Sequence, residues 1–233
     1  MIAKTLALSA VLLASVPVSA FASCASDGGT GTGATYADMV LAGEGGGNWQ
    51  ATNLLGESTA TGAYQFTYGT LQELGYISHD SRAVGTDMYG AGEWQGVTWT
   101  GKDGINSRTD FLNSQSAQVN ALTDFTERNL AAINADYSST ANGVPVTPGG
   151  VGYAAHFLGA GGYQQWASCG HQPQCLPAAA LASNSSYTPE TMNDMLMGRM
   201  AEGAGVDPSC IDPSLHEGQE LPGIALMPWT TEV

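Results

Sequence analysis

The stretch that decides the fold covers residues 108–135 and reads RTDFLNSQSAQVNALTDFTERNLAAINA. Its large apolar side chains recur at approximate helical spacing, at Leu112, Val119, Leu122, Phe125, Leu130 and Ile133. We predict one long helix here, which forms the centre of the fold. Arg108 and Asp110 at its start are typical of solvated charges at a helix end.

Shorter helices are predicted on both sides of this stretch. Residues 36–44 and 67–74 carry helical patterns that stop at glycines, the first at Gly45-Gly46-Gly47. Further along, Thr147-Pro148 and Thr188-Pro189 each combine an N-cap residue with a proline suited to a first helical turn. We expect the helix after Thr147 to end at Gly159.

Strand signals are scarce in comparison. Strict alternation of apolar and polar residues is hard to find, and residues 94–99 are the candidate for a short β-hairpin or an irregular flap. We therefore predict a mainly α fold with a long central helix and such a flap.

The composition excludes some classes of partner. The chain has 233 residues, of which 43% are hydrophobic, so it can bury a core. It has 21 acidic and 6 basic residues, for a formal charge of −15. Because no basic surface can form to neutralise phosphates, we expect no nucleic acid and no anionic membrane as partner.

The first residues are typical of an export signal. Lys4 precedes an apolar stretch, and Ala20-Phe21-Ala22 offers small residues to signal peptidase, so we predict a signal peptide over residues 1–22. The apolar stretch is too short to span a bilayer, and we expect no transmembrane segment in the mature chain. The protein is then periplasmic or secreted. Processing as a lipoprotein through Cys24 is the alternative.

Four cysteines in an exported chain favour disulfides. Cys169 and Cys175 would close a short loop, and Cys24 with Cys210 would then tie the two ends together. A zinc site formed by Cys169, His171 and Cys175 is the alternative, which we rank below the disulfide. We expect no metal and no organic cofactor.

The domain boundaries follow from composition. Residues 23–35 are rich in Gly, Ser and Thr and are predicted to be a linker. Residues 36–205 carry the helical patterns and are predicted to form one folded domain. Residues 206–233 are acidic, contain prolines and are predicted to be a tail.

Glu44 is the candidate for chemistry. It ends a predominantly apolar helix and is followed by three glycines and Asn48. Apolar neighbours disfavour the charged form of a carboxyl, so that it can hold and donate a proton near neutral pH. The glycines would let a bulky substrate lie directly against the backbone.

The residues around Glu44 resemble a known pattern. The stretch Ala42-Gly43-Glu44-Gly45-Gly46-Gly47-Asn48, followed by Thr61-Gly62-Ala63-Tyr64-Gln65-Phe66, resembles the lysozyme-like fold of bacterial lytic transglycosylases and goose-type lysozymes. A later segment, residues 147–162, resembles the helix and glycine turn that carry Tyr-Asn-Ala-Gly in the transglycosylases. The resemblance covers most of residues 36–205.

This resemblance implies a catalytic role and a set of sugar-binding residues. Glu44 would be the catalytic acid in the cleavage of β-1,4 bonds between N-acetylmuramic acid and N-acetylglucosamine of peptidoglycan. The expected substrate-binding residues are Asn48, Trp49, Gly62, Tyr64, Gln65, Tyr153 and His156.

Three departures from the family pattern leave alternatives open. Gly45 stands where a Ser follows the Glu, the Glu44-to-Gln65 spacing is longer than in the family, and His156-Phe157 replaces Tyr-Asn. His156 either substitutes for the missing polar contact or fills the core.

The reaction type depends on a second carboxylate. A lytic transglycosylase can reuse its acid as the base on the substrate's own 6-hydroxyl, whereas a hydrolase needs a partner carboxylate. Glu57, Glu73 and Asp87 are the candidates, and each also fits a solvated surface role. Because none stands out as a partner, we favour the transglycosylase.

The acidity of the chain favours a confined role. Peptidoglycan is itself anionic and would repel a strongly acidic enzyme at long range. We therefore expect local remodelling of the producer's own wall, with an envelope or secretion assembly as a candidate partner. The alternatives are a catalytically silent glycan-binding or envelope-interaction protein on the same fold, and a purely structural secreted protein.

Overall fold

The computed structural model describes residues 35–44, 46–52, 58–82, 92–209 and 211. The described chain is mainly α, as predicted, with one antiparallel ladder of two very short strands. In chain order the elements are α1 (Tyr36–Glu44), α2 (Tyr68–Glu73), η2 (Lys102–Gly104), α3 (Arg108–Asn113), α4 (Gln115–Ala132), β1 (Thr140–Ala141), β2 (Val144–Pro145), α5 (Pro148–Ala167), η3 (Pro173–Cys175), α6 (Ala178–Ser183) and α7 (Pro189–Gly203).

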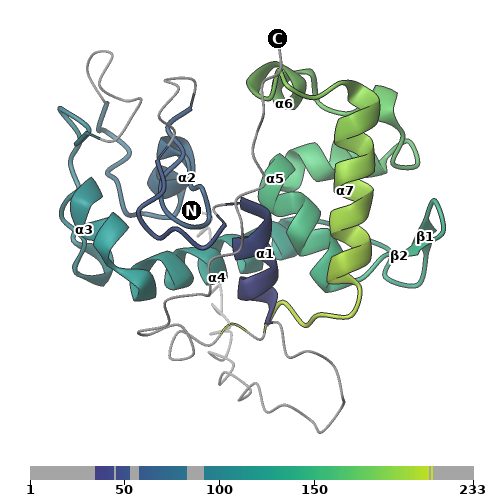
Figure 1. Cartoon of the computed structure of the whole chain (residues 1–233), viewed down its shortest axis with the longest axis horizontal. Helices are drawn as coiled ribbons and strands as arrows, with labels where there is room; N and C mark the ends of the chain where they lie inside the picture. Colours follow the sequence, from purple (N-terminus) through teal and green to yellow (C-terminus); the bar gives the residue numbers. More distant parts are fainter. Residues whose placement is uncertain (1–34, 45, 53–57, 83–91, 210, 212–233) are drawn as a thin grey trace, which may run out of the picture.

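These elements form two groups joined by α4. Figure 1 shows α2 and α3 on one side, and α5, α6, α7 and the β1–β2 ladder on the other. Helix α4 runs along the base from the first group to the second, and α1 stands between them. The last residue of α1, Glu44, therefore lies where the two groups meet.

The helix ends follow the local sequence signals. Thr67, Thr147 and Thr188 are N-caps whose side chains accept hydrogen bonds from backbone N–H groups of the first turn. The predicted helices at residues 36–44 and 67–74 are confirmed as α1 and α2. The helices predicted after Thr147 and Thr188 are confirmed as α5 and α7.

The prediction of one helix over residues 108–135 is wrong, because the chain breaks at Ser114. Ser114 is extended (φ −108°, ψ 97°), and its side chain accepts a hydrogen bond from the Ala117 N–H to start α4. The end of α3 leaves carbonyl groups without helical partners. The Gln118 side chain compensates by donating to the carbonyl oxygen of Phe111 at 3.0 Å. Ser114 is thus both the C-cap of α3 and the N-cap of α4, and it divides the stretch into these two helices.

Gly159 breaks α5 in two: the helix that starts after Thr147 ends there, as predicted, and a second helical segment follows within α5. The Gly159 backbone has φ 68° and ψ 166°, outside the helical region, and α5 continues beyond it to Ala167. A positive φ of this size favours glycine. The glycine thus changes the course of α5 in mid-length.

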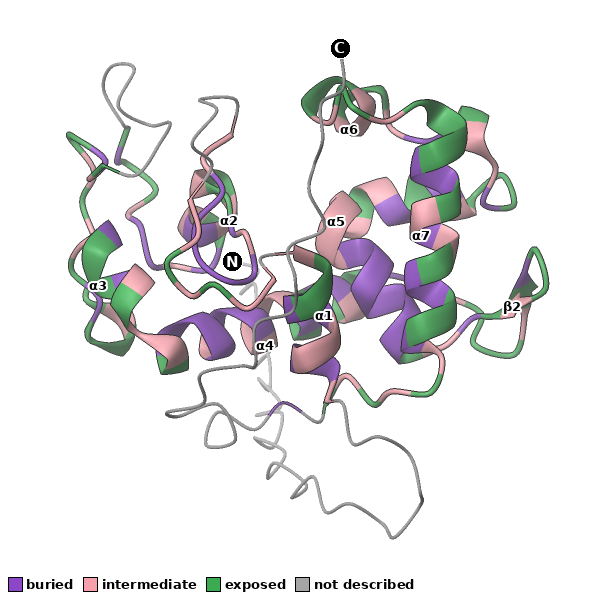
Figure 2. Cartoon of the chain, viewed as in Figure 1, coloured by how far each residue is buried: buried purple, intermediate pink, exposed green. Residues whose placement is uncertain are grey.

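Two clusters of buried side chains fill the interior. The first joins α1 and α4 to the segments around α2 and α3, with Phe66, Phe111 and Leu122 among its members. The second lies between α5 and α7, with Trp166 and Leu196 at 0% exposure. Figure 2 shows buried residues on α5 and on the side of α7 that faces it. Helix α5 contributes to both clusters, because its Tyr153 belongs to the first.

The expected flap at residues 94–99 contains no strand ladder of its own. Trp99 forms an isolated antiparallel bridge with Ile77, and the rings of Trp94 and Trp99 stack with centroids 6.0 Å apart. Of the two structures proposed for this segment, the irregular one is therefore observed.

Two further predictions concern the ends of the domain and the cysteines. Cys169 and Cys175 form a disulfide, as preferred over the zinc site. Cys24 and Cys210, the signal peptide and the linker up to residue 34 lie outside the described residues. Val206 and Ile211, which fall in the predicted tail, pack on the first cluster. No described helix has the length and apolar character needed to cross a membrane.

Candidate functional site

Glu44 forms an ion pair with a residue of α7. The Arg199 Nη1 atom donates to Glu44 Oε1 at 2.5 Å, and Arg199 Nη2 donates to the carbonyl oxygen of Gly43 at 3.3 Å. The two side chains are 9% (Arg199) and 14% (Glu44) exposed. The carboxyl is thus largely shielded from water, as expected, but a cation contacts it where the sequence indicated apolar surroundings.

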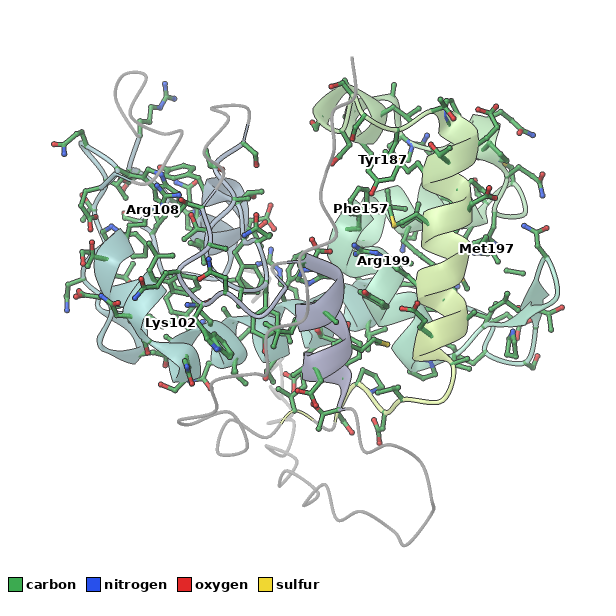
Figure 3. All side chains as sticks on the ribbon, viewed as in Figure 1. Lys102, Arg108, Phe157, Tyr187, Met197 and Arg199 are labelled. Atoms are coloured by element: carbon green, nitrogen blue, oxygen red, sulfur yellow. A yellow bond between two sulfur atoms is a disulfide. The ribbon has the colours of Figure 1, made fainter. Side chains whose placement is uncertain are left out.

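Aromatic rings surround the guanidinium group. Its central carbon lies 4.7 Å from the ring centroid of Tyr153 and 5.1 Å from that of Phe157, both on α5. The Tyr187 ring lies edge-on to Phe157 with centroids 6.4 Å apart. Figure 3 shows Arg199, Phe157 and Tyr187 close together beside α5 and α7. Cation–π attraction in such a shielded place restrains the guanidinium.

Arg199 was missed by the sequence analysis although the sequence carries a signal for it. Residues Met192, Leu196, Arg199 and Gly203 follow one another at spacings of four, three and four, and all are buried on one face of α7. An arginine at an apolar position is costly unless it is paired. In a chain with 6 basic residues, an arginine on this face indicates a buried acidic partner.

Tyr153 lies directly against the end of α1. A Cβ atom at position 43 would come within 1.8 Å of the Tyr153 hydroxyl oxygen, so Gly43 is required for this approach. Burial raises the pKa of Tyr153 to about 12; the Arg199 charge opposes this effect and the Glu44 charge adds to it. The phenol therefore stays neutral beside the carboxylate.

His156, one turn after Tyr153 on α5, is held in one tautomer. Its Nε2 atom lies 3.0 Å from the carbonyl oxygen of Tyr64, which can only accept, so Nε2 carries the hydrogen. Burial lowers the pKa of His156, while the Glu44 charge acts in the opposite direction. The neutral ring then presents an unprotonated Nδ1, which is buried and has no hydrogen-bond partner among the described residues. Edge contacts with Phe66 and Phe125 also pack the ring into the core.

Tyr64 and Trp49 pack against each other in the first cluster of buried side chains. Their rings meet edge to face with centroids 5.8 Å apart. Tyr64 is fully buried, and its hydroxyl has no hydrogen-bond partner in the described part of the chain. Burial, followed by the charge of Asp38, raises the pKa of Tyr64. Through its carbonyl bond to His156, Tyr64 connects Trp49 to α5.

The remaining predicted binding residues serve local turns. The Asn48 side chain accepts a hydrogen bond from the Gln50 N–H, and the Gln65 side chain donates to the Gly62 carbonyl at 2.7 Å. Gly62 has φ +79°, and a Cβ there would come within 2.3 Å of the Gln118 amide oxygen. None of these residues is brought into contact with Glu44 by the bonds described. Gly62 and Gln65 belong to the turn that holds Tyr64, and Asn48 belongs to a separate turn with Gln50.

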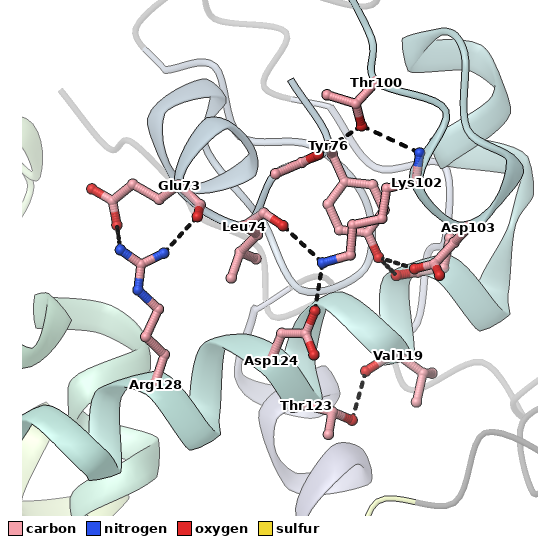
Figure 4. Close-up of polar contacts among 12 residues, drawn as sticks. Glu73, Leu74, Tyr76, Thr100, Lys102, Asp103, Val119, Thr123, Asp124 and Arg128 are labelled. Atoms are coloured by element: carbon pink, nitrogen blue, oxygen red, sulfur yellow. Dashed lines mark hydrogen bonds and ion pairs between the residues drawn. The ribbon is translucent and has the colours of Figure 1, made fainter. Parts of the chain in front are cut away.

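Glu73, the one described candidate for a second carboxylate, does not join Glu44. Glu73 pairs with Arg128 at 3.6 Å in a set of polar contacts between α2, η2 and α4 (Figure 4). The same set contains the Lys102–Asp124 ion pair and the short bond from Tyr76 to Asp103. Glu57 and Asp87 lie outside the described residues.

A cavity of about 380 Å³ lies elsewhere, between the end of α4, the strand segment and α5. Tyr163, Gln164 and His171 are among its lining residues, and none of the predicted site residues lines it. Across the described ranges, no group of three His, Cys, Asp or Glu side chains is arranged to hold a metal ion.

No protein-family model, no curated protein and no solved structure matches this chain. The geometry nevertheless defines what the site can do chemically. A shielded carboxyl at a helix end, with a fixed cation against one oxygen, can release a proton to a neighbouring group and take one back.

Proposed function

We propose that this protein is an exported peptidoglycan-cleaving enzyme of the lysozyme-like class, most simply a lytic transglycosylase, with Glu44 as its acid and base. One observation carries the proposal. The Glu44 carboxyl ends α1, is 14% exposed, and is held beside Tyr153 and Phe157 by Arg199. Gly46 and Gly47 follow it with positive φ, a conformation that favours glycine. Because glycine has no side chain, the backbone there is free of bulky groups.

The arrangement of the helices is consistent with this class. In the resembling families the catalytic Glu ends a helix, and Glu44 ends α1 between the two groups of elements that α4 joins. Tyr64 and Gln65 lie in the turn between Thr61 and Phe66, and His156 reaches that turn from α5 through its bond to Tyr64. These contacts bring segments that carry the resemblance to one region of the molecule.

The chemistry requires one carboxyl. Glu44 gives a proton to the glycosidic oxygen as the bond to C1 breaks, and the transition state has oxocarbenium-ion character. The resulting carboxylate takes the proton of the substrate's 6-hydroxyl while that oxygen bonds to C1 and closes a 1,6-anhydro ring. Glu73, the described candidate for a second carboxylate, is occupied by Arg128. The lyase reaction is therefore favoured over hydrolysis.

A catalytically silent glycan-binding protein is the second candidate, and the ion pair favours it. Arg199 occupies Oε1 of Glu44, and this contact between α7 and α1 is by itself a sufficient reason for a buried carboxyl at this place. On this alternative, Glu44 and Arg199 serve to join α1 to α7. Both proposals share three expectations: export to the periplasm or medium, peptidoglycan as ligand, and an envelope or secretion assembly as partner.

Digestion of purified sacculi separates the two. The wild-type protein, Glu44→Gln and the control Glu127→Gln, which alters an exposed carboxyl on α4, are incubated with sacculi, and the soluble products are identified by mass. We expect anhydro-muropeptides from the wild type and the control and none from Glu44→Gln. Products with reducing ends would indicate a hydrolase, and binding to sacculi without product would indicate the silent protein.

A further inference from the structure

The guanidinium of Arg199 divides its hydrogen bonds between a side chain and the backbone. Nη1 contacts Glu44 Oε1, and Nη2 contacts the carbonyl oxygen of Gly43. It therefore does not grip both carboxylate oxygens, as arginine does in a bidentate pair. Glu44 Oε2 has no hydrogen bond to any described residue.

Several contacts fix this guanidinium in place. Tyr153 and Phe157 hold it with ring centroids at 4.7 and 5.1 Å, and the residue is 8% exposed. The Gly43 carbonyl is one of the acceptors that the end of α1 leaves without a helical partner. Arg199 thus caps α1 and orients its last side chain with the same planar group.

We propose that Arg199 is the positioning residue of the site, which anchors Glu44 Oε1 and reserves Oε2 for proton transfer to and from the glycan. This inference rests on the proposed function. A guanidinium offers hydrogen-bond donors and no acceptor, so Arg199 takes no part in the proton exchange itself.

The two steps then use the two carboxyl oxygens differently. The proton on Oε2 passes to the glycosidic oxygen, which keeps the electron pair of the breaking bond to C1. The new carboxylate is stabilised by the guanidinium on Oε1. Oε2 then accepts the proton of the 6-hydroxyl as its oxygen bonds to C1, and the site returns to its starting state without water.

Three titratable side chains share the surroundings of Glu44 and Arg199. Tyr153 and His156 from α5 and Tyr187 from the segment before α7 interact electrostatically with both residues, and Glu202 of α7 acts on Tyr153. Burial raises the pKa values of Tyr153 and Tyr187 and lowers that of His156, so all three are neutral near pH 7. Arg199 is the cation of this set.

The test compares kcat and KM for sacculus cleavage by Arg199→Met, Arg199→Lys and the wild type. We expect Arg199→Met to lower kcat by at least 100-fold with a smaller change in KM. Arg199→Lys keeps the charge but loses the planar group, so it should recover part of kcat.

A matched control removes another arginine that pairs with a carboxylate. Arg128→Met breaks the exposed pair with Glu73 and should leave both kcat and KM unchanged. Wild-type kcat in folded Arg199→Met, or a KM that rises as strongly as kcat falls, would overturn the positioning role.

A second measurement does not depend on activity. The melting temperatures of the wild type, Glu44→Gln, Arg199→Met and the double variant form a double-mutant cycle. We expect the melting temperature of the double variant to fall by less than the sum of the two single decreases, because each single change leaves one charged or polar partner unpaired. Additive losses would refute the pair. If the wild type does not cleave sacculi, the proposed function fails while this cycle still reports on the contact.

Discussion

The contact between α5 and α7 is close enough that one methyl group should disturb it. A Cβ at Gly203, the last residue of α7, would lie 2.6 Å from the carbonyl carbon and oxygen of Gly149 and 2.7 Å from the Cα of Gly150. All three are backbone atoms, so they cannot rotate away. Gly203→Ala therefore forces the helices apart by several tenths of an ångström.

The magnitude follows from the cost of overpacking. Extra methyl groups in a tightly packed interior cost about 1–3 kcal/mol. For a chain of this size, 1 kcal/mol shifts the melting temperature by about 2–4 °C. We expect Gly203→Ala to melt about 2–12 °C below the wild type. Because Arg199 lies one turn earlier on the same face of α7, cleavage activity should fall as well.

Gly198 provides the matched control on the same helix. A Cβ there meets nothing within 4 Å, and the residue is exposed. Gly198→Ala should therefore stabilise the protein by about 0.5–1 kcal/mol through helix propensity. Both variants are measured by thermal unfolding monitored by circular dichroism. Equal melting temperatures for Gly203→Ala and Gly198→Ala would show that the helices do not touch through their backbones.

Two further predictions concern the turn at Gly62 and the buried histidines. Gly62→Ala should lower the free energy of unfolding by at least about 1 kcal/mol more than Gly75→Ala, because both have φ +79° but only Gly62 meets a buried amide, that of Gln118; equal denaturation midpoints would contradict this. Burial lowers the pKa of both His156 and His171, so below about pH 6.5 the unfolded chain binds protons that the folded chain does not. The free energy of unfolding therefore decreases as the pH is lowered, by up to about 1.4 kcal/mol per pH unit for each histidine. His156→Gln should reduce that loss between pH 7 and pH 5 in urea denaturation, and an unchanged loss would show that the ring is charged in the fold.

The sequence predicted the helix starts well because they depend on local chemistry. At Thr147-Pro148 and at Thr188-Pro189, the cap residue and the N–H group that it binds lie three residues apart in the chain. Both helices begin at these caps. The break at Ser114 was not predicted, because apolar spacing continues on both sides of it. A serine cap interrupts a helix without changing that spacing.

The candidate site likewise has one part that depends on local sequence and another that depends on how the helices pack. Glu44 at the end of a helix before glycines is a local feature, and its position was predicted. Arg199 is 155 residues away in the chain, and its role depends on how α7 packs against α1. Gly62 was predicted to line a sugar site, but its neighbour Gln118 gives the glycine a packing role that spacing alone does not reveal.

The products of sacculus digestion test the central claim most directly. We predict that the wild-type protein releases muropeptides with 1,6-anhydro ends, each lighter by one water than the hydrolytic product, and that Glu44→Gln releases none. Equal release of glycan fragments by the wild type and by folded Glu44→Gln would contradict the assignment of Glu44 as the proton donor.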